Sequence, residues 1–169
     1  MLLINRTDIA TKVQISDSVY DDTLNEYIEQ AQFLDMQDLL GVEFYNDILR
    51  NKTDANYIAL LDGSTYEISG LFYTNVGLKT PIIYYTNARY KRFGSQQDTS
   101  FGLIEKSNEF SDRVSKSEKQ VTYKLNQQMA FKYWRNVEAF LNRKSADYPL
   151  WNKGNCNSRR QTFRVTPIR

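Results

Sequence analysis

A row of apolar residues between positions 117 and 143 constrains the fold more than any other feature of this chain. Apolar side chains recur there every four positions, and three further residues widen the row. The members are Val121, Leu125, Met129, Tyr133, Val137 and Leu141, joined by Ala130, Trp134 and Phe140. The spacing predicts an α-helix of about 40 Å, at 1.5 Å per residue, with the row buried in the core. Ser115 and Glu118 predict a capping box at its beginning.

Two shorter helices are predicted earlier in the chain. In the first, Thr23 and Glu26 have the spacing of a capping box, and Gly41 is placed to end the helix. The expected inner face of this helix consists of Leu24, Tyr27, Ile28, Ala31 and Leu34. Residues 42–51 predict the second helix. The side chains that it is expected to turn inward are Phe44, Ile48 and Leu49.

The middle of the chain is divided by glycine and proline. Residues 54–63 predict a third short helix. Residues 63–77 hold three of the seven glycines, which favours a loop or a hairpin. Thr80, Pro81 and Gly94 then have the positions of a cap, a first helical residue and an exit. A further helix is therefore predicted between Thr80 and Gly94.

These elements predict a mainly α-helical fold. We expect a bundle of four to five helices with one long C-terminal helix, a small hairpin or loop insertion and extended termini. Residues 1–152 are expected to form a helical domain, and residues 153–169 an extended basic C-terminal arm. A chain of 169 residues with 41% hydrophobic residues is long enough to bury a core without disulfides or metals.

Composition argues against several kinds of catalysis. The chain has no histidine and a single cysteine, Cys156, so an imidazole-based catalytic triad and a four-ligand Cys/His zinc site are excluded. No glycine-rich phosphate-binding motif occurs, and no apolar run approaches the length that spans a bilayer. We therefore expect a protein that is not an enzyme, with no cofactor, no metal and no membrane partner.

The charges are divided unevenly along the chain. Residues 1–62 hold 12 Asp and Glu and four Lys and Arg, whereas residues 63–169 hold eight acidic and 18 basic residues. A basic half suits a polyanion such as DNA. Opposite charges also suit head-to-tail contacts between identical copies, which close into rings. A third interpretation is that the charges only solvate the two ends of a monomer.

Two clusters of basic residues are candidate partner sites. Arg89, Lys91 and Arg92 are interleaved with aromatic residues, as in surfaces that neutralise phosphates and stack on bases, and they are candidates for a DNA channel. Cations at a helix C-terminus are also expected from the helix dipole alone. In the arm, alternating apolar and polar residues favour a strand that docks on a partner protein over an arm that grips nucleic acid. Its candidate docking residues are Arg159, Arg160, Phe163, Arg164, Val165, Ile168 and Arg169.

Four segments form a recognisable combination. They are LDMQDLLGVEFYNDIL, GLKTPIIYYTNARYKRF, DTSFGLIEKSNEFS and YPLW. Together they resemble the small head–tail connector (adaptor) proteins of tailed bacteriophages, over residues 15–152. The resemblance implies a structural virion protein, made in the host cytoplasm and located in the neck at the head–tail junction. Twelve copies would form a ring below the portal, extend the DNA channel and offer a platform to the next neck or tail protein.

The resemblance also implies where partners bind. Gln96, Asp98 and Phe101 would belong to a loop that contacts another ring, and the C-terminal arm would reach the portal or a neighbouring subunit. The expected partners are further copies of the chain, the portal protein and another neck or tail protein, with non-specific contact to genomic DNA. The alternative is a structural protein that associates with nucleic acid through its basic C-terminal tail.

Overall fold

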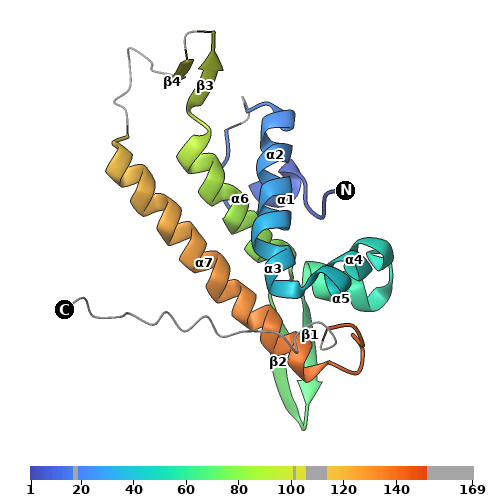
Figure 1. Ribbon diagram of the computed structural model, residues 1–169. Helices are drawn as coiled ribbons and strands as arrows, with labels where there is room; N and C mark the ends of the chain where they lie inside the picture. Colours follow the sequence, from blue (N-terminus) through green and yellow to red (C-terminus); the bar gives the residue numbers. More distant parts are fainter. Residues whose placement is uncertain (17–18, 101, 106–113, 152–169) are drawn as a thin grey trace, which may run out of the picture.

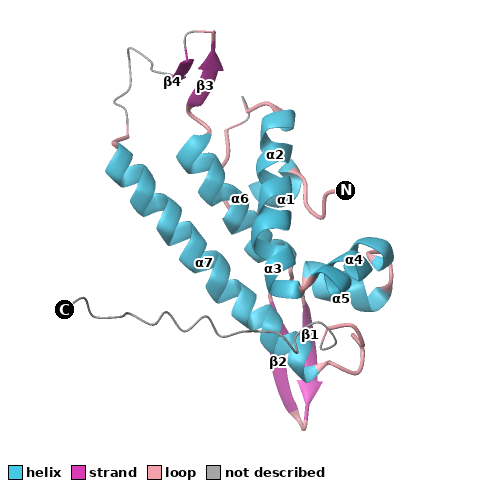
Figure 2. Cartoon of the chain, in the orientation of Figure 1, coloured by secondary structure: helices cyan, strands magenta, loops and turns pink. Residues whose placement is uncertain are grey.

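The computed structural model describes residues 1–16, 19–100, 102–105 and 114–151. They form a mainly α-helical fold with one long C-terminal helix and a small hairpin, as predicted (Figure 1, Figure 2). A second hairpin lies between the two longest helices in the chain. In chain order the elements are α1 (Arg6–Ala10), α2 (Asp21–Ala31), η1 (Gln32–Met36), α3 (Gln37–Leu40), α4 (Val42–Asn51), α5 (Ala55–Asp62), β1 (Ser64–Ile68), β2 (Leu71–Asn75), α6 (Lys79–Phe93), β3 (Gln96–Thr99), β4 (Gly102–Glu105) and α7 (Lys116–Arg143).

Helix α6 is the central element of the bundle. It packs against α7 and also against α2. The rings of Tyr84 on α6 and Tyr133 on α7 stack with centroids 5.0 Å apart. One turn further along, the amide of Asn87 donates a hydrogen bond to Asn126 over 2.8 Å. Figure 1 shows α6 between α2 and the N-terminal half of α7, so these two helices present their outward sides on different sides of the bundle.

The beginning of α7 is confirmed as a capping box. The Oγ of Ser115 accepts a hydrogen bond from the backbone N–H of Glu118, and the Glu118 carboxylate accepts one from the N–H of Ser115. Two of the N–H groups that a helix start leaves without partners are thereby satisfied. The Ser115 hydroxyl and the Ser115 N–H each donate a hydrogen bond to the Glu118 carboxylate, and these two bonds lower the pKa of that carboxyl.

The capping box predicted for the first long helix is wrong. Helix α2 begins at Asp21, with Tyr20 as its N-cap and no side-chain cap. Thr23 is therefore already inside the helix. Asp21 and Asp22 lie in the first turn, where carboxylates are stabilised by the positive end of the helix dipole. The charges of this turn take the place of the expected cap.

The predicted cap of α6 is also displaced. The helix begins at Lys79, and Thr80 lies in the first turn, where its Oγ donates a hydrogen bond to the carbonyl of Val76. Gly94 follows the last residue of the helix, as predicted. A capping box that the sequence analysis did not predict begins α1, where Asn5 and Asp8 exchange the two hydrogen bonds.

A π-helical turn, η1, interrupts the segment between α2 and α3. Because each π-helical hydrogen bond spans one residue more than in an α-helix, the side chains that follow are rotated. Leu34, predicted to face inward, is consequently 61% exposed, while Gln32 is buried. The amide of Gln32 accepts a hydrogen bond from the N–H of Leu3 and donates one to the hydroxyl of Tyr45. This buried side chain therefore fastens the N-terminal segment to the bundle.

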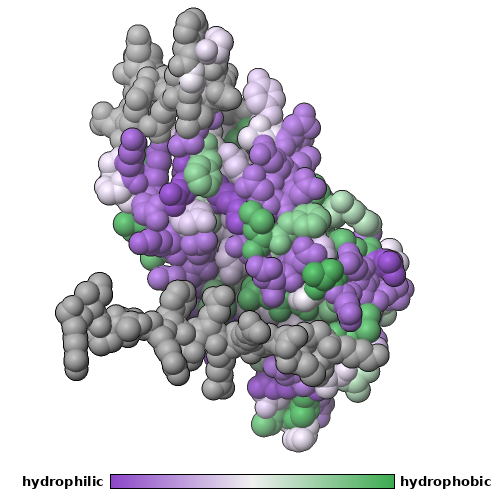
Figure 3. Space-filling view, viewed as in Figure 1, coloured by the Kyte–Doolittle hydropathy of each residue, from purple (hydrophilic) through white to green (hydrophobic). Residues whose placement is uncertain are grey.

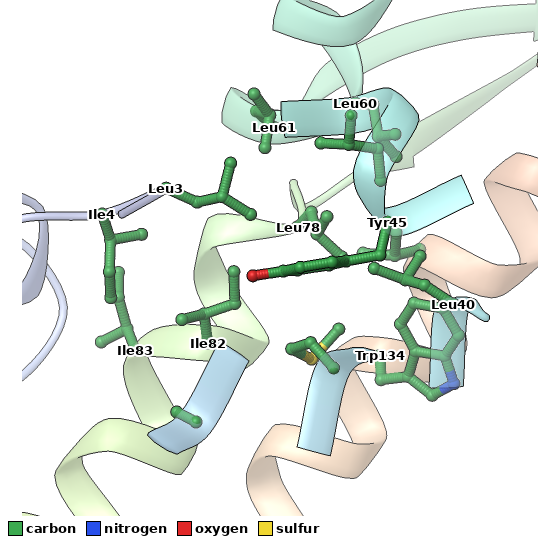
Figure 4. Packing of buried hydrophobic residues seen from close by; sticks show 14 of the residues in the cluster. Leu3, Ile4, Leu40, Tyr45, Leu60, Leu61, Leu78, Ile82, Ile83 and Trp134 are labelled. Carbon is green, nitrogen blue, oxygen red and sulfur yellow. The ribbon is translucent and has the colours of Figure 1, made fainter. Parts of the chain in front are cut away.

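The core is one continuous cluster that includes residues from both ends of the described chain. Tyr45 lies in its middle, among Leu3, Leu78 and Ile82 (Figure 4). At the end of α7, the ring of Trp151 packs 5.6 Å from Phe44 and 5.9 Å from Trp134, measured between centroids. The segment after α7 thus folds back and closes the core.

The hairpin of β1 and β2 is fixed to α7 at its base. Its turn is Ser69–Gly70, both with positive φ (53° and 80°), as the two-residue turns of hairpins require. At the base, a Cβ on Gly77 would lie 2.6 Å from backbone atoms of the segment before β1, so the two ends can close only around a glycine. The side chain of Asn136 on α7 accepts a hydrogen bond from the N–H of Val76. The hairpin therefore has a defined position relative to the long helix.

Candidate functional site

The apolar row of α7 is buried over only part of its length. Val137 and Leu141 are buried, as predicted, but Val121, Leu125 and Met129 are 56%, 54% and 41% exposed. The prediction that the whole row belongs to the core is therefore wrong for its N-terminal half. An apolar surface lies there that no described part of the chain covers.

The reason lies in the period of the row. An α-helix turns about 100° per residue, so residues four apart are rotated by about 40° relative to each other. From Val121 to Leu141 the row turns through about 200° and passes from one side of the helix to the other. The buried side follows the helical period instead, through Ala130, Trp134 and Val137.

Basic side chains flank the exposed part of the row. Lys124, Lys132 and Arg135 are exposed, and helical geometry places them on the same side of α7 as Leu125. We call this surface the outer α7 face, and its residues are Val121, Lys124, Leu125, Met129, Lys132 and Arg135. Helix α7 as a whole contains six Lys and Arg and two Glu. The outer α7 face is therefore both apolar and basic.

A groove adjoins this face, where η1 and α7 approach each other over α6. Its volume is about 510 Å³. The lining residues are Asp35, Tyr85, Lys124, Gln127, Gln128, Phe131 and Lys132. Burial raises the pKa of the Tyr85 hydroxyl to about 12, with a further contribution from the charge of Asp35.

A second exposed surface has the opposite charge. Residues 21–49 contain eight Asp and Glu and no Lys or Arg. Large apolar side chains lie exposed among the acids, and Figure 3 shows hydrophobic groups in green between hydrophilic ones in purple over α2 to α4. We call this surface the acidic face, and its exposed residues are Asp22, Glu26, Glu29, Phe33, Leu34, Asp38, Val42 and Glu43. It is an apolar and acidic counterpart of the outer α7 face.

A third exposed apolar surface lies at the tip of the β1–β2 hairpin. Leu71 and Phe72 follow the Ser69–Gly70 turn directly and are 61% and 75% exposed. In Figure 1 the hairpin extends beyond the helices at the lower end of the molecule. The base of the hairpin is held by α7, where Arg143 donates a hydrogen bond to Tyr66 and lies 4.3 Å from the centroid of the Tyr73 ring.

Arg89, one of three residues predicted to line a DNA channel, lies in the interior instead. It is 7% exposed and forms an ion pair of 2.5 Å with Asp35. A guanidinium held in this way is not available to phosphate groups. Burial raises the pKa of the Asp35 carboxyl more than the hydrogen bond and charge of Arg89 lower it. The pair thus belongs to the structural framework beneath the groove.

Lys91 and Arg92, the other two predicted DNA-channel residues, lie at the end of α6 and reach the surface. The guanidinium of Arg92 lies 4.9 Å from the centroid of the Tyr123 ring. Together with Lys116 and Lys119 these residues form a basic cluster that we call the basic end. An open pocket of about 290 Å³ lies there and is lined in part by Arg92, Lys116 and Lys119. The structure therefore brings cations of α6 and α7 together.

The remaining predicted sites are described only in part. Gln96 begins β3 and lines the pocket of the basic end, and the backbone of Asp98 pairs with Leu103 of β4. The expected contact loop is thus a hairpin. Phe101 lies outside the described residues, as do all members of the C-terminal arm, namely Arg159, Arg160, Phe163, Arg164, Val165, Ile168 and Arg169.

The described residues contain neither a metal-binding cluster nor a membrane-spanning helix. No group of three or more His, Cys, Asp or Glu side chains within them could hold a metal ion. None of the helices described has both the length and the apolarity of a membrane span. The candidate functional sites in the described part of the chain are therefore its exposed surfaces.

The sequence analysis missed the acidic face and the hairpin tip as apolar surfaces. A signal for the tip is present in the sequence, because residues directly after a two-residue turn have few neighbours to cover them. Phe33 and Leu34 carried no comparable signal. Their exposure depends on the π turn, which side-chain periodicity does not predict.

Comparisons with known proteins identify one family. The model of a family of unknown function, DUF6712, matches residues 36–161, which is most of the chain and includes α3 to α7. Neither the curated proteins nor the solved structures contain a match to the chain. From the extent of the family match, the chain belongs to the DUF6712 family.

Proposed function

We propose that the protein is a structural component of the virion neck of a tailed bacteriophage. Copies of the chain form a ring between the portal and the tail, extend the DNA channel and offer a docking platform to the next neck or tail protein. The protein acts by assembly and not by catalysis. The resemblance of residues 15–152 to head–tail connector proteins motivates the proposal.

One observation carries the proposal most directly. Exposed large apolar side chains gather in three separate places, on the outer α7 face, the acidic face and the hairpin tip. Contiguous exposed apolar surface on a soluble protein marks sites of interaction. A ring subunit needs such surfaces on two sides for its neighbours and at one end for the next layer. Three surfaces in these places fit that requirement better than they fit a protein with one partner.

Co-sedimentation with portal rings from the same genome tests the proposal. The full chain is expected to sediment with the rings. A chain lacking residues 154–169 is expected to lose that binding while it keeps its helical circular dichroism, because the arm supplies the docking contact. Absence of binding by the full chain would contradict a portal-docked position.

Variants of the hairpin tip extend the same experiment to the next neck protein. Leu71→Ser with Phe72→Ser removes the exposed apolar side chains without touching the base of the hairpin. If the tip contacts the next layer, this variant binds portal rings normally but no longer recruits the following neck protein. Ile58→Ser is a matched control, because Ile58 is an exposed apolar residue outside the three surfaces.

The alternative function is association with nucleic acid. The observation in its favour is the basic end, where Lys91, Arg92, Lys116 and Lys119 gather beside aromatic rings. Such a surface would bind DNA with an affinity that falls steeply as salt rises. Fluorescence anisotropy with a labelled duplex, at low and at high salt, distinguishes the two functions. Lack of binding even at low salt excludes the alternative.

A further inference from the structure

We infer that the outer α7 face of one copy docks on the acidic face of a second copy. The inference rests on the proposed function in one respect, namely that repetition of this contact closes into a ring. It names the two surfaces and the partner, which the proposed function leaves open.

Charge complementarity is the first step. Residues 21–49 contain eight acids and no base, and α7 contains six bases and two acids. Within the two surfaces, Glu26 and Glu29 are exposed on one side and Lys124 and Lys132 on the other. Opposed surfaces of this kind attract each other over distances comparable to the Debye length and exclude wrong partners.

Spacing along the helices is the second step. Asp22 and Glu29 are seven residues apart, which is about 10.5 Å along a helix, and Lys124 and Lys132 are eight apart, which is about 12 Å. Two helices laid side by side can therefore bring both pairs of charges together. Apolar side chains adjoin the charges of each surface: Phe33 and Leu34 follow Glu29 on one, and Leu125 and Met129 lie between Lys124 and Lys132 on the other.

The arrangement in the bundle is the third step. Helix α6 packs between α2 and the N-terminal half of α7 (Figure 1). Within one copy the two faces are held apart by α6 and by the groove that Asp35, Lys124 and Lys132 line, so they do not meet each other. A contact between two different surfaces of identical copies leaves one surface unused at each end, so it repeats and produces a closed ring or a filament. A two-fold dimer does not follow from this geometry.

Charge reversal tests the attraction. Lys124→Glu with Lys132→Glu is expected to weaken self-association at least about tenfold. Glu26→Lys with Glu29→Lys is expected to do the same. Analytical ultracentrifugation measures the dissociation constant. A chain with all four substitutions has both surfaces reversed and is expected to associate again. Glu67→Lys with Asp147→Lys is the matched control, because these exposed acids lie outside both surfaces.

Cross-linking tests the pairing of the two surfaces. In a Cys156→Ser background, Leu34→Cys and Leu125→Cys are introduced separately and then together, and a short bismaleimide is added with and without portal rings. A mixture of the two single-cysteine chains is expected to give dimers, and the double variant a ladder of oligomers. Dimers formed by Leu125→Cys alone would overturn the inference, because like surfaces would then meet. Monomers under all these conditions would overturn it as well.

Three further outcomes separate this inference from its alternatives. If removal of residues 154–169 abolishes self-association of the unsubstituted chain, the occupant of the acidic face is the basic arm, and the inference fails. If portal rings bind the protein while none of the cross-links forms, the neck function stands and this interface is excluded. If the double variant gives cross-linked oligomers but the protein does not bind portal rings, the interface is supported and the proposed position next to the portal is excluded.

Discussion

Both halves of α7 carry members of the apolar row, but the two halves have opposite environments. In the C-terminal half, Trp134 and Val137 are buried against the core, whereas in the N-terminal half Val121 and Leu125 are more than half exposed. Membership of the apolar row alone therefore does not determine whether a side chain is covered. The angle at which each side chain leaves the helix decides it, together with the position of α6. A long helix can thus stabilise the fold at one end and leave an apolar surface free at the other.

The largest expected difference between the two halves of α7 is in the unfolding free energy lost when one side chain in each half is truncated. Trp134→Ala removes a buried indole that packs on Trp151, and such changes cost about 3–5 kcal/mol of unfolding free energy. Met129→Ala, one turn earlier on the exposed side, is expected to change it by less than about 0.5 kcal/mol. Denaturant unfolding of both variants measures the difference. Equal losses would mean that the N-terminal half is covered as well.

The buried ion pair beneath the groove is expected to have the next largest effect. Arg89→Met leaves the carboxylate of Asp35 without its partner in a mostly buried position, and breaking a buried pair in this way costs about 3 kcal/mol. Asp35→Leu combined with Arg89→Met removes both charges and is expected to restore most of the stability. A double variant no more stable than Arg89→Met would contradict this account.

The stability that Arg89→Met loses is expected to depend on pH in one direction. Burial already raises the pKa of Asp35 in the folded state, and loss of Arg89 removes the interactions that oppose the rise. A carboxyl whose pKa is higher in the folded state destabilises the fold once it ionises. The loss in Arg89→Met is therefore largest at neutral pH and disappears below about pH 4, where the unfolded chain also holds the proton. Unfolding curves at several pH values check this trend.

Sequence and structure agree at several positions where a local rule decides, although the caps predicted at Thr23 and Thr80 are exceptions. Ser115 and Glu118 form the capping box that their spacing predicts, and Gly41 and Gly94 end helices as expected. In these cases a few neighbouring residues supply all the hydrogen bonds involved. Local chemistry was also sufficient to predict the mainly helical fold.

Disagreement begins where a distant part of the chain decides. Arg89 resembles a surface cation in the sequence, and only the fold brings Asp35 to it from 54 residues away. The exposure of Leu125 likewise depends on which side of α7 meets α6. None of these relations is contained in a local pattern, so the candidate surfaces could not be predicted as the fold was.

A smaller effect is expected at the beginning of α7. Ser115→Ala removes the side chain that caps the helix, and such losses cost about 1 kcal/mol. Because no described part of the chain covers the outer side of this half of α7, we expect the change to appear as faster amide hydrogen exchange there than in the C-terminal half. Thr23→Ala is the control, since Thr23 has the sequence signature of a cap without its position. A similar cost for Thr23→Ala would argue that α2 begins later than described.

Leu125→Ser is expected to have the smallest effect on the isolated chain. Its side chain is 54% exposed, so the substitution loses little burial, and the lower helix propensity of serine accounts for at most about 0.5 kcal/mol. Self-association stabilises the folded state more strongly as the protein concentration rises. The thermal midpoint of the unsubstituted protein should therefore rise with concentration, and that of Leu125→Ser should not. Calorimetry over a range of concentrations measures both. A large loss at low concentration would assign Leu125 to the core, and an unchanged concentration dependence would remove it from the interface.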